Sequence, residues 1–260
     1  MRQFPNRYGS WAVVAGASEG LGVAFARHLA AREMNLLLIA RRADLLEKVS
    51  EEIRQQYSVK IRCLVQDLGD AQLAEELREA TEGLEIGVLV YNAAHVPTGS
   101  FLDTDPESLQ QLVRVNIQGP VTVVRTLAPG MCQRKKGAII LMSSLAGMQG
   151  VPRIAAYAAT KAFGTILAEG LWYELREYNV EVTASCAGAM PTPGYLRNFK
   201  QDAPGMMDPS TVAEMTLEAL GRGPRFIPGW VNRIGALVTT RLISRKSAIQ
   251  LMGKSTGHLQ

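Results

Sequence analysis

Short apolar runs of strand length recur along the chain. They span residues 11–16, 35–40, 60–66, 86–92, 137–143 and 180–188. Because these runs are mostly apolar, they are typical of strands that are buried on both faces of a parallel sheet. The segments between them carry apolar residues at helical spacing, as in residues 43–57. This alternation predicts one α/β domain over residues 1–260, with a doubly wound parallel sheet in a three-layer α/β/α arrangement.

Two segments depart from the alternation. Residues 189–207 contain three prolines and two glycines and predict a long irregular loop, a substrate lid at the carboxyl ends of the strands. Residues 230–252 predict a basic amphipathic helix. We expect this helix to cover the site or to pack at a subunit interface, in preference to lying on a membrane.

Charge is distributed unevenly around that helix. The net charge is +4, but no acidic residue follows Glu218, so the tail carries +7 and the rest of the chain −3. A solvated helix face is the favoured explanation, and a membrane surface, an acidic partner or phosphate groups are the alternatives. We expect no nucleic-acid partner.

The composition, 47% hydrophobic, is that of a globular protein with a full core. Cys63, Cys132 and Cys186 lack the paired spacing of a zinc site or a disulfide framework, so we expect free thiols in a reducing compartment and no metal. The first residues resemble neither a signal peptide nor a spanning helix. A cytoplasmic location is therefore expected.

A glycine-rich turn follows the first apolar run. Its residues are Gly16, Ala17, Ser18, Glu19, Gly20, Leu21 and Gly22. In a strand–turn–helix context, such glycines allow a tight turn, close approach of a pyrophosphate to the backbone, and close packing of the helix on the strand. The following helix presents backbone N–H groups and the positive end of its dipole to the phosphates. The sequence thus predicts a Rossmann-type dinucleotide site, although a glycine turn alone could serve packing only.

Charge at the end of the second run indicates which dinucleotide binds. A carboxylate there would hold the ribose 2′-hydroxyl of NAD, but the chain has Arg41 and Arg42, and cations suit a 2′-phosphate. NADP(H) is therefore the expected cofactor, although Glu19 in the glycine turn could pair with an arginine and weaken that preference. We place further cofactor contacts in two strand-end segments, where each residue could also be a simple turn residue: Asp67, Leu68, Asn92, Ala93 and Ala94.

Tyr157 and Lys161 lie four residues apart in a helical stretch, so their side chains share one helix face. A nearby ammonium favours the phenolate, so we expect Lys161 to lower the pKa of Tyr157 toward the range useful for acid–base catalysis. This spacing alone also occurs by chance on amphipathic helices.

Several motifs in a fixed order carry a clear resemblance. The glycine turn GASEGLG, NAA at 92–94, Asn116 in VNIQG, Ser144 in MSSLAG and the Tyr157–Lys161 pair resemble the short-chain dehydrogenase/reductase family of the classical type. The resemblance extends to about residue 230. It implies that the catalytic set consists of Asn116, Ser144, Tyr157 and Lys161, and that the protein transfers hydride between nicotinamide and a carbonyl or secondary alcohol.

The resemblance also implies a role for each member of this set. Tyr157 would exchange the proton with the substrate oxygen, and Ser144 would stabilise charge on that oxygen. Lys161 would bind the nicotinamide ribose, and Asn116 would hold a water that relays protons. Ser143 is the alternative serine, and only one of the two can face the site because adjacent strand residues point in opposite directions.

The segment after the sixth run resembles the family's P-G-x-V-x-T, with Ala187 in place of the proline. It implies cofactor contacts from Gly188, Met190 and Thr192. Residues 94–101, 145–153 and 189–207 are rich in apolar side chains and predict a pocket for a medium or large apolar ketone or alcohol, steroid-like or 3-oxoacyl-like. These apolar residues could equally pack the lid. The predicted substrate contacts are Ser144, Leu145, Met190, Tyr195 and Phe199.

Family members commonly assemble through two helices, which implies a homodimer or homotetramer formed by residues 105–133 and 154–178. Two alternative functions remain: an NADP-binding regulatory or scaffold protein without turnover, and a membrane-surface binding protein that uses the basic tail. Retention of all four catalytic residues argues against the first.

Overall fold

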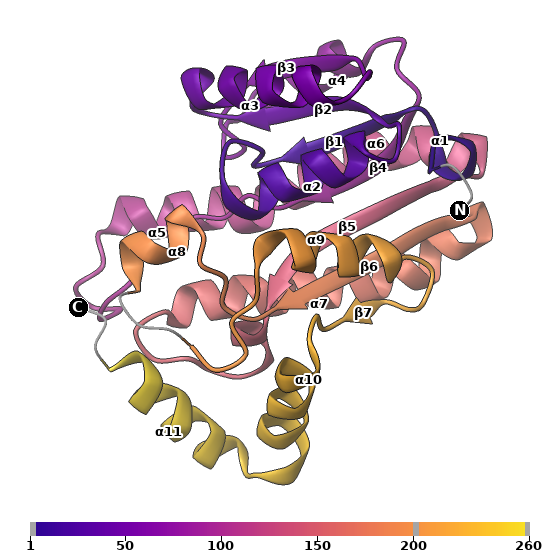
Figure 1. The fold of residues 1–260 in the computed structure, drawn as a ribbon. Helices are drawn as coiled ribbons and strands as arrows, with labels where there is room; N and C mark the ends of the chain where they lie inside the picture. Colours follow the sequence, from indigo (N-terminus) through magenta and orange to yellow (C-terminus); the bar gives the residue numbers. More distant parts are fainter. Residues whose placement is uncertain (1–3, 200–202, 258–260) are drawn as a thin grey trace.

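A computed structural model describes residues 4–199 and 203–257 of the chain. Its centre is a seven-stranded sheet in the order β3-β2-β1-β4-β5-β6-β7, in which neighbouring strands are parallel (Figure 1). The predicted doubly wound α/β fold is confirmed. The strands are β1 (Trp11–Ala15), β2 (Asn35–Ala40), β3 (Ile61–Val65), β4 (Ile86–Tyr91), β5 (Gly137–Ser144), β6 (Val180–Ala187) and β7 (Arg225–Phe226).

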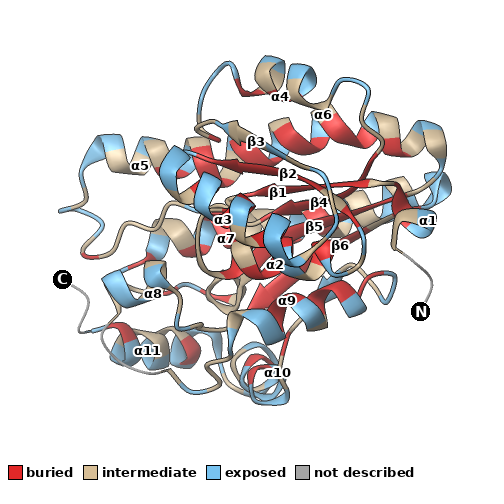
Figure 2. Ribbon diagram, turned by 45° about the horizontal axis from the view of Figure 1, so that its top comes forward, coloured by how far each residue is buried: buried red, intermediate tan, exposed pale blue. Residues whose placement is uncertain are grey.

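Helices cover both faces of the sheet, because side chains of the central strands alternate between two buried clusters. One cluster joins the sheet to α2 (Gly20–Ala30), α3 (Ala43–Gln56) and α9 (Pro209–Glu218). The other joins it to α4 (Leu73–Thr81), α6 (Gly119–Arg134) and α7 (Ala155–Leu175). Figure 2 shows the strands β1, β2, β4, β5 and β6 buried between the helices, which explains why their sequence runs are mostly apolar.

The remaining elements lie at the ends of these layers. They are α1 (Phe4–Tyr8), α5 (Pro106–Val113), the π-turn η1 (Arg114–Gln118), the 3-10 turns η2 (Leu145–Met148) and η3 (Arg176–Tyr178), α8 (Pro193–Asn198), α10 (Trp230–Leu237), the π-turn η4 (Val238–Leu242) and α11 (Arg245–Thr256).

The strand order reverses between β1 and β4, which are neighbours in the sheet although two strands separate them in the sequence. In doubly wound folds the crevice at the carboxyl ends of such a pair binds the ligand, because the connections leave in opposite directions. The glycine turn follows β1 and residues 92–94 follow β4, so both segments border this crevice.

Two predicted segments are wrong in detail. Residues 189–207 are not irregular throughout, because Thr192 caps the helix α8 and its hydroxyl accepts from the Tyr195 N–H at 3.1 Å; residues 200–202 lie outside the described part. Residues 230–252 do not form one helix. Ile243 has extended backbone, and the Ser244 hydroxyl begins a second helix by accepting from the Ser247 N–H.

The strand β7 was not predicted. It has only two residues, which are too few for a hydrophobic pattern, and it exists because the Ala184 N–H donates to the Pro224 carbonyl at the sheet edge.

Candidate active site

Backbone segments pack closely against one another at the glycine turn. Gly16 and Gly20 have φ of +88° and +57°, conformations that favour glycine. A Cβ at Gly16 would lie 2.7 Å from the Ala93 nitrogen, and one at Gly22 would lie 1.9 Å from the Gly16 carbonyl oxygen. The helix α2 begins at Gly20 without a side-chain cap, so its first N–H groups and dipole suit a pyrophosphate. These features fit a dinucleotide.

The strand-end residues after β3 and β4 border the turn, and one of them bonds to it. The Asn92 amide donates to the Gly16 carbonyl at 3.0 Å. The Asp67 carboxylate accepts from the Gly69 N–H at 2.8 Å and from the Gln111 amide. Leu68 is buried, and Ala93 and Ala94 are at least partly accessible beside the turn.

Arginines surround the outer end of the crevice. Arg41 lies 3.5 Å from the Asp67 carboxylate. Arg42 lies 3.0 Å from the Glu19 carboxylate and donates to the Ser18 hydroxyl at 3.2 Å. Glu19 therefore does pair with an arginine, as the sequence suggested.

A second arginine reaches Glu19 from the lid. Arg197 of α8 forms an ion pair with Glu19 at 2.5 Å, and this contact, followed by that of Arg42, holds the pKa of Glu19 below its usual range. Sequence reasoning missed Arg197. Its position as a cation within the predicted lid was the available signal, but 178 residues separate it from Glu19.

The two serines at the end of β5 point in opposite directions. The Ser143 hydroxyl is buried and bonds at 2.8 Å to the Lys161 carbonyl and to the Thr165 hydroxyl. Ser144 is partly accessible and accepts from the Ala146 N–H at 3.1 Å, and its side chain interacts with the Tyr157 phenol and lowers the pKa of Tyr157. The geometry therefore brings Ser144, and not Ser143, to the phenol.

Lys161 lies beside Tyr157, with its Nζ 5.5 Å from the ring centre. The ammonium is buried and donates to the Met142 carbonyl at 2.8 Å. Burial lowers the pKa of Lys161 to about 8.

The expected direction of the Tyr157 pKa is wrong for this structure. Burial raises the pKa of Tyr157 to about 12, and the hydrogen bond with Ser144 is the effect that lowers it. Burial therefore outweighs the other effects on this phenol, while the Lys161 ammonium donates its own hydrogen bond to the Met142 carbonyl.

Asn116 lies in η1, and three hydrogen bonds to residues outside η1 fix its side chain. Its carbonyl accepts from the His95 N–H at 2.8 Å, and its amide donates to the His95 carbonyl at 2.9 Å and to the Thr160 hydroxyl at 3.1 Å. Thr160 directly precedes Lys161. A π-turn within a helix often marks a functional position, and here it lets Asn116 join the loop after β4 to the helix that carries Tyr157 and Lys161.

The segment after β6 closes the inner side of the crevice. A Cβ at Gly188 would lie 2.8 Å from the Asn232 amide, which leaves room only for backbone. The Thr192 side chain contacts Gly20 of the glycine turn, since a Cβ there would lie 2.9 Å away. Met190 packs against the core cluster that contains α2.

Apolar side chains from three elements meet beside Tyr157. Tyr195 and Phe199 of the lid are stacked with ring centres 4.6 Å apart. Phe199, Met252 of α11 and Tyr157 pack against a small buried cluster containing Val151. Leu145 begins η2 directly after Ser144.

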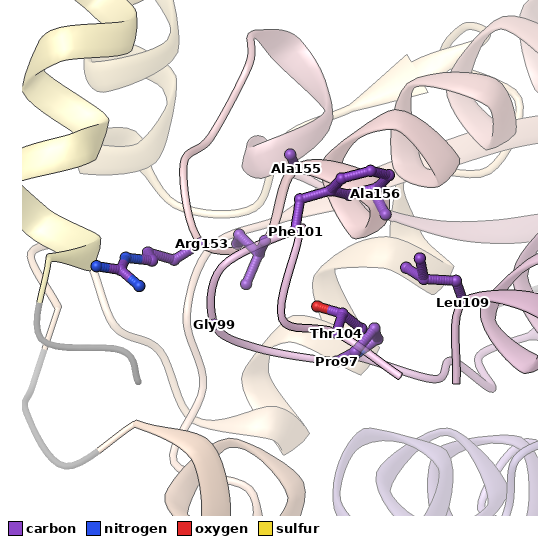
Figure 3. Close-up of a pocket in the computed structure, with 9 residues that line it drawn as sticks. Pro97, Gly99, Phe101, Thr104, Leu109, Arg153, Ala155 and Ala156 are labelled. Atoms are coloured by element: carbon purple, nitrogen blue, oxygen red, sulfur yellow. The ribbon is translucent and has the colours of Figure 1, made fainter. Parts of the chain in front are cut away.

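A small hollow lies at the start of α7, within two residues of Tyr157. Figure 3 shows that the Arg153 side chain extends away from Phe101 and Leu109, so the remaining wall is mostly apolar. It is lined by Pro97, Gly99, Phe101, Thr104, Leu109, Arg153, Ile154, Ala155 and Ala156. Within residues 4–199 and 203–257, no cluster of His, Cys, Asp or Glu is placed to hold a metal ion.

The parallel sheet, the glycine turn at its reversal point and the tyrosine–serine–lysine group beside it define a dinucleotide-binding oxidoreductase. The model of the short chain dehydrogenase family matches residues 10–202. The chain therefore belongs to the short-chain dehydrogenase/reductase family, whose members use nicotinamide cofactors.

Two relatives illustrate the range of similar sequences. The 7beta-hydroxysteroid dehydrogenase of Clostridium sardiniense is 34% identical over 259 residues, which cover 98% of this chain and 99% of that protein. The very-long-chain 3-oxoacyl-CoA reductase of Anas platyrhynchos is 37% identical over 179 residues, which cover 67% of this chain and 57% of that protein.

Solved structures share the same fold. A structure described for 7beta-hydroxysteroid dehydrogenase stereoselectivity matches with a TM-score of 0.90 and 28% identity, covering 96% of this chain and 99% of that one. A short-chain dehydrogenase from Sphingobium yanoikuyae in complex with NADPH matches with a TM-score of 0.79 and 27% identity, covering 89% and 93%.

Proposed function

We propose that the protein is an NADP(H)-dependent oxidoreductase that interconverts an apolar ketone and the corresponding secondary alcohol. The observation that carries this proposal is the grouping of Ser144, the Tyr157 phenol and the buried Lys161 at the carboxyl end of the sheet, with the Lys161 Nζ 5.5 Å from the Tyr157 ring centre. A bound nicotinamide supplies or accepts the hydride at this position.

The chain's own residues handle the proton and the substrate oxygen. Tyr157 donates its phenolic proton to that oxygen in reduction and accepts it in oxidation, and Ser144 donates a hydrogen bond that stabilises the developing charge. Lys161 binds the ribose hydroxyls. Asn116, whose side chain is fixed by hydrogen bonds to His95 and Thr160, would hold the water that relays protons from Lys161 to solvent.

Arg42 and Arg41 support the preference for NADP(H). Both are exposed at the end of β2, where a 2′-phosphate would form charge-assisted hydrogen bonds with them. Glu19 already holds Arg42, so it would compete with the phosphate. A fold relative from Sphingobium yanoikuyae that holds NADPH adds support.

The apolar wall supports a sizeable hydrophobic substrate. Phe199, Tyr195 and Met252 present aromatic and thioether surface beside Tyr157, and methionine adapts to varied shapes. Two similar proteins, a hydroxysteroid dehydrogenase and a 3-oxoacyl-CoA reductase, support a steroid-like or 3-oxoacyl-like substrate.

Exposed apolar side chains on α6 and α7 support assembly into a homodimer or homotetramer. Val121 of α6 is 43% exposed, and Ile166 and Tyr173 of α7 are 66% and 60% exposed. Burial of this surface against a second copy would remove it from water.

The test is Tyr157→Phe, which removes the proton but keeps the ring. We expect it to abolish NADPH-dependent reduction of a panel of steroids, 3-oxoacyl thioesters and aromatic ketones, while NADPH binds with nearly unchanged affinity. The measurement is NADPH oxidation at 340 nm, alongside a fluorescence titration of NADPH. Retained turnover would refute the role of Tyr157. If the unaltered protein binds NADPH tightly but turns over no carbonyl on the panel, it is a regulatory or scaffold protein instead.

A further inference from the structure

The helix α10 presents its apolar side to water. Trp230, Ile234 and Leu237 recur at a spacing of four and three residues, so they form one stripe, and they are 73%, 53% and 53% exposed. The opposite side, with Asn232 and Ala236 at 4% and 6%, faces the protein. An amphipathic surface helix ordinarily buries its apolar side, so this reversed orientation indicates a partner for the stripe.

Exposed leucines and cations also occur in the segment that follows α10. Leu242 in η4 is 68% exposed and Leu251 in α11 is 49% exposed. No acidic residue occurs between residues 219 and 260. In the part of this segment that the structure describes, none of the five cations from residue 230 onward forms an ion pair with a carboxylate. They are Arg233, Arg241, Arg245, Lys246 and Lys254.

This combination favours a membrane surface over a second copy of the chain. A two-fold contact through the stripe would bring two sets of five cations together with no carboxylate from the segment between them. An anionic bilayer offers hydrocarbon to the leucines and negative charge to the cations. Tryptophan also prefers the boundary between lipid and water.

We propose that residues 230–251 dock on the surface of a bilayer that contains anionic lipids, with Trp230, Ile234 and Leu237 inserted and the cations at the headgroups. Among the described residues, no helix has the length and apolar character of a membrane span. The proposal is independent of the reaction at Tyr157.

Docking through this side would bring the site close to the membrane. On the inner side of α10, the Asn232 amide donates to the Gly205 carbonyl at 3.1 Å and to the Pro228 carbonyl at 3.0 Å, and it contacts Gly188. One helix, roughly 10 Å across, therefore separates the stripe from the end of the lid segment and the loop after β6. A substrate dissolved in the bilayer would have a short path to the site.

The test is co-sedimentation of the full chain with two kinds of vesicle. One kind is phosphatidylcholine alone, and the other is equal parts phosphatidylcholine and phosphatidylglycerol. We expect at least about 10-fold stronger binding to the anionic vesicles, and weaker binding as the salt concentration rises. The Trp230 emission should shift to shorter wavelength on binding, and Trp230→Phe should remove that shift while Trp11 and Trp172 remain.

Two variants separate the apolar and charge contributions. The double variant Ile234→Asp with Leu237→Asp should abolish vesicle binding, and Arg241→Gln with Lys246→Gln should weaken it about 10-fold or more. Tyr178→Asp changes an exposed aromatic residue outside this segment and should bind as the unaltered chain does. Circular dichroism confirms that each variant is folded.

The vesicle experiment can fail or succeed independently of the proposed reaction at Tyr157. NADPH oxidation without vesicles should be the same in the double aspartate variant as in the unaltered chain, whichever substrate is active. Equal binding to both kinds of vesicle, or binding to neither, would overturn the proposal. It would also be overturned if the double variant kept its vesicle affinity. If the unaltered chain did not bind lipid and the double variant changed the oligomer size on gel filtration, the stripe would be a contact between copies of the chain instead.

Discussion

Replacing Lys161 by methionine should make the protein more stable and inactive. Lys161 is 7% exposed, and burial lowers its pKa from 10.5 to about 8. A shift of one pKa unit corresponds to about 1.4 kcal/mol. The lowered pKa of Lys161 therefore means that keeping its ammonium charged in the folded protein costs roughly 3 kcal/mol at neutral pH. Methionine has a similar length and no charge to desolvate.

The lost hydrogen bond offsets part of this gain. The Lys161 ammonium donates to the Met142 carbonyl at 2.8 Å, and such a bond contributes about 1 kcal/mol. We therefore expect Lys161→Met to raise the free energy of unfolding by about 2 kcal/mol at pH 7, and the Tm by about 4–8 °C. Turnover should fall to background.

The stability difference between Lys161→Met and the unaltered protein should depend on pH. Below pH 8, Lys161 is protonated in both the folded and the unfolded chain, so the full cost is present. Between pH 8 and 10.5 the unfolded chain binds the proton and the folded chain does not, so the stability of the unaltered protein rises with pH. The advantage of Lys161→Met should therefore shrink by roughly 3 kcal/mol across this range and change sign near its upper end.

The assay is urea unfolding of both proteins without added nucleotide at several pH values from 7 to about 10.5. Lys48→Met, on the exposed side of α3, is the control for loss of a solvated lysine. A stability difference that stays constant with pH would refute the reasoning. So would a Lys161→Met protein that is less stable than the unaltered chain at pH 7.

Two further substitutions test the cofactor crevice. Glu19→Gln removes the carboxylate that competes for Arg42, and we expect NADPH to bind about 2- to 5-fold more tightly relative to NADH, as judged by fluorescence titration; an unchanged ratio would mean that the 2′-phosphate is bound elsewhere. Gly22→Ala places a methyl group 1.9 Å from the Gly16 carbonyl, so NADPH affinity should fall at least about 10-fold. Gly170→Ala, with open space around its Cβ, is the matched control, and equal losses in both variants would contradict the packing argument.

The elements that the sequence predicted well are those governed by local physics. Parallel strands inside a sheet need largely apolar runs, and the six predicted runs coincide with β1 to β6 to within about one residue at each end. The one-turn spacing of Tyr157 and Lys161 is likewise a property of any helix, and the helix is α7. Motif order was enough to define the family.

The sequence alone left other features open because they depend on residues distant along the chain. The pKa of Tyr157 follows from its burial beside the lid and α11, so its net shift is upward and not downward as the helix spacing predicted. The lid contact between Glu19 and Arg197 joins positions 178 residues apart.

By itself, the sequence determined the sheet, the glycine turn and the helical spacing of the catalytic pair, because hydrophobic periodicity and backbone geometry act between near neighbours. Only the tertiary structure decided that Ser144 and not Ser143 meets Tyr157, and that the apolar side of α10 faces outward. A hydrophobic pattern shows that a helix has an apolar side. Which way that side faces depends on how the rest of the chain packs against the helix.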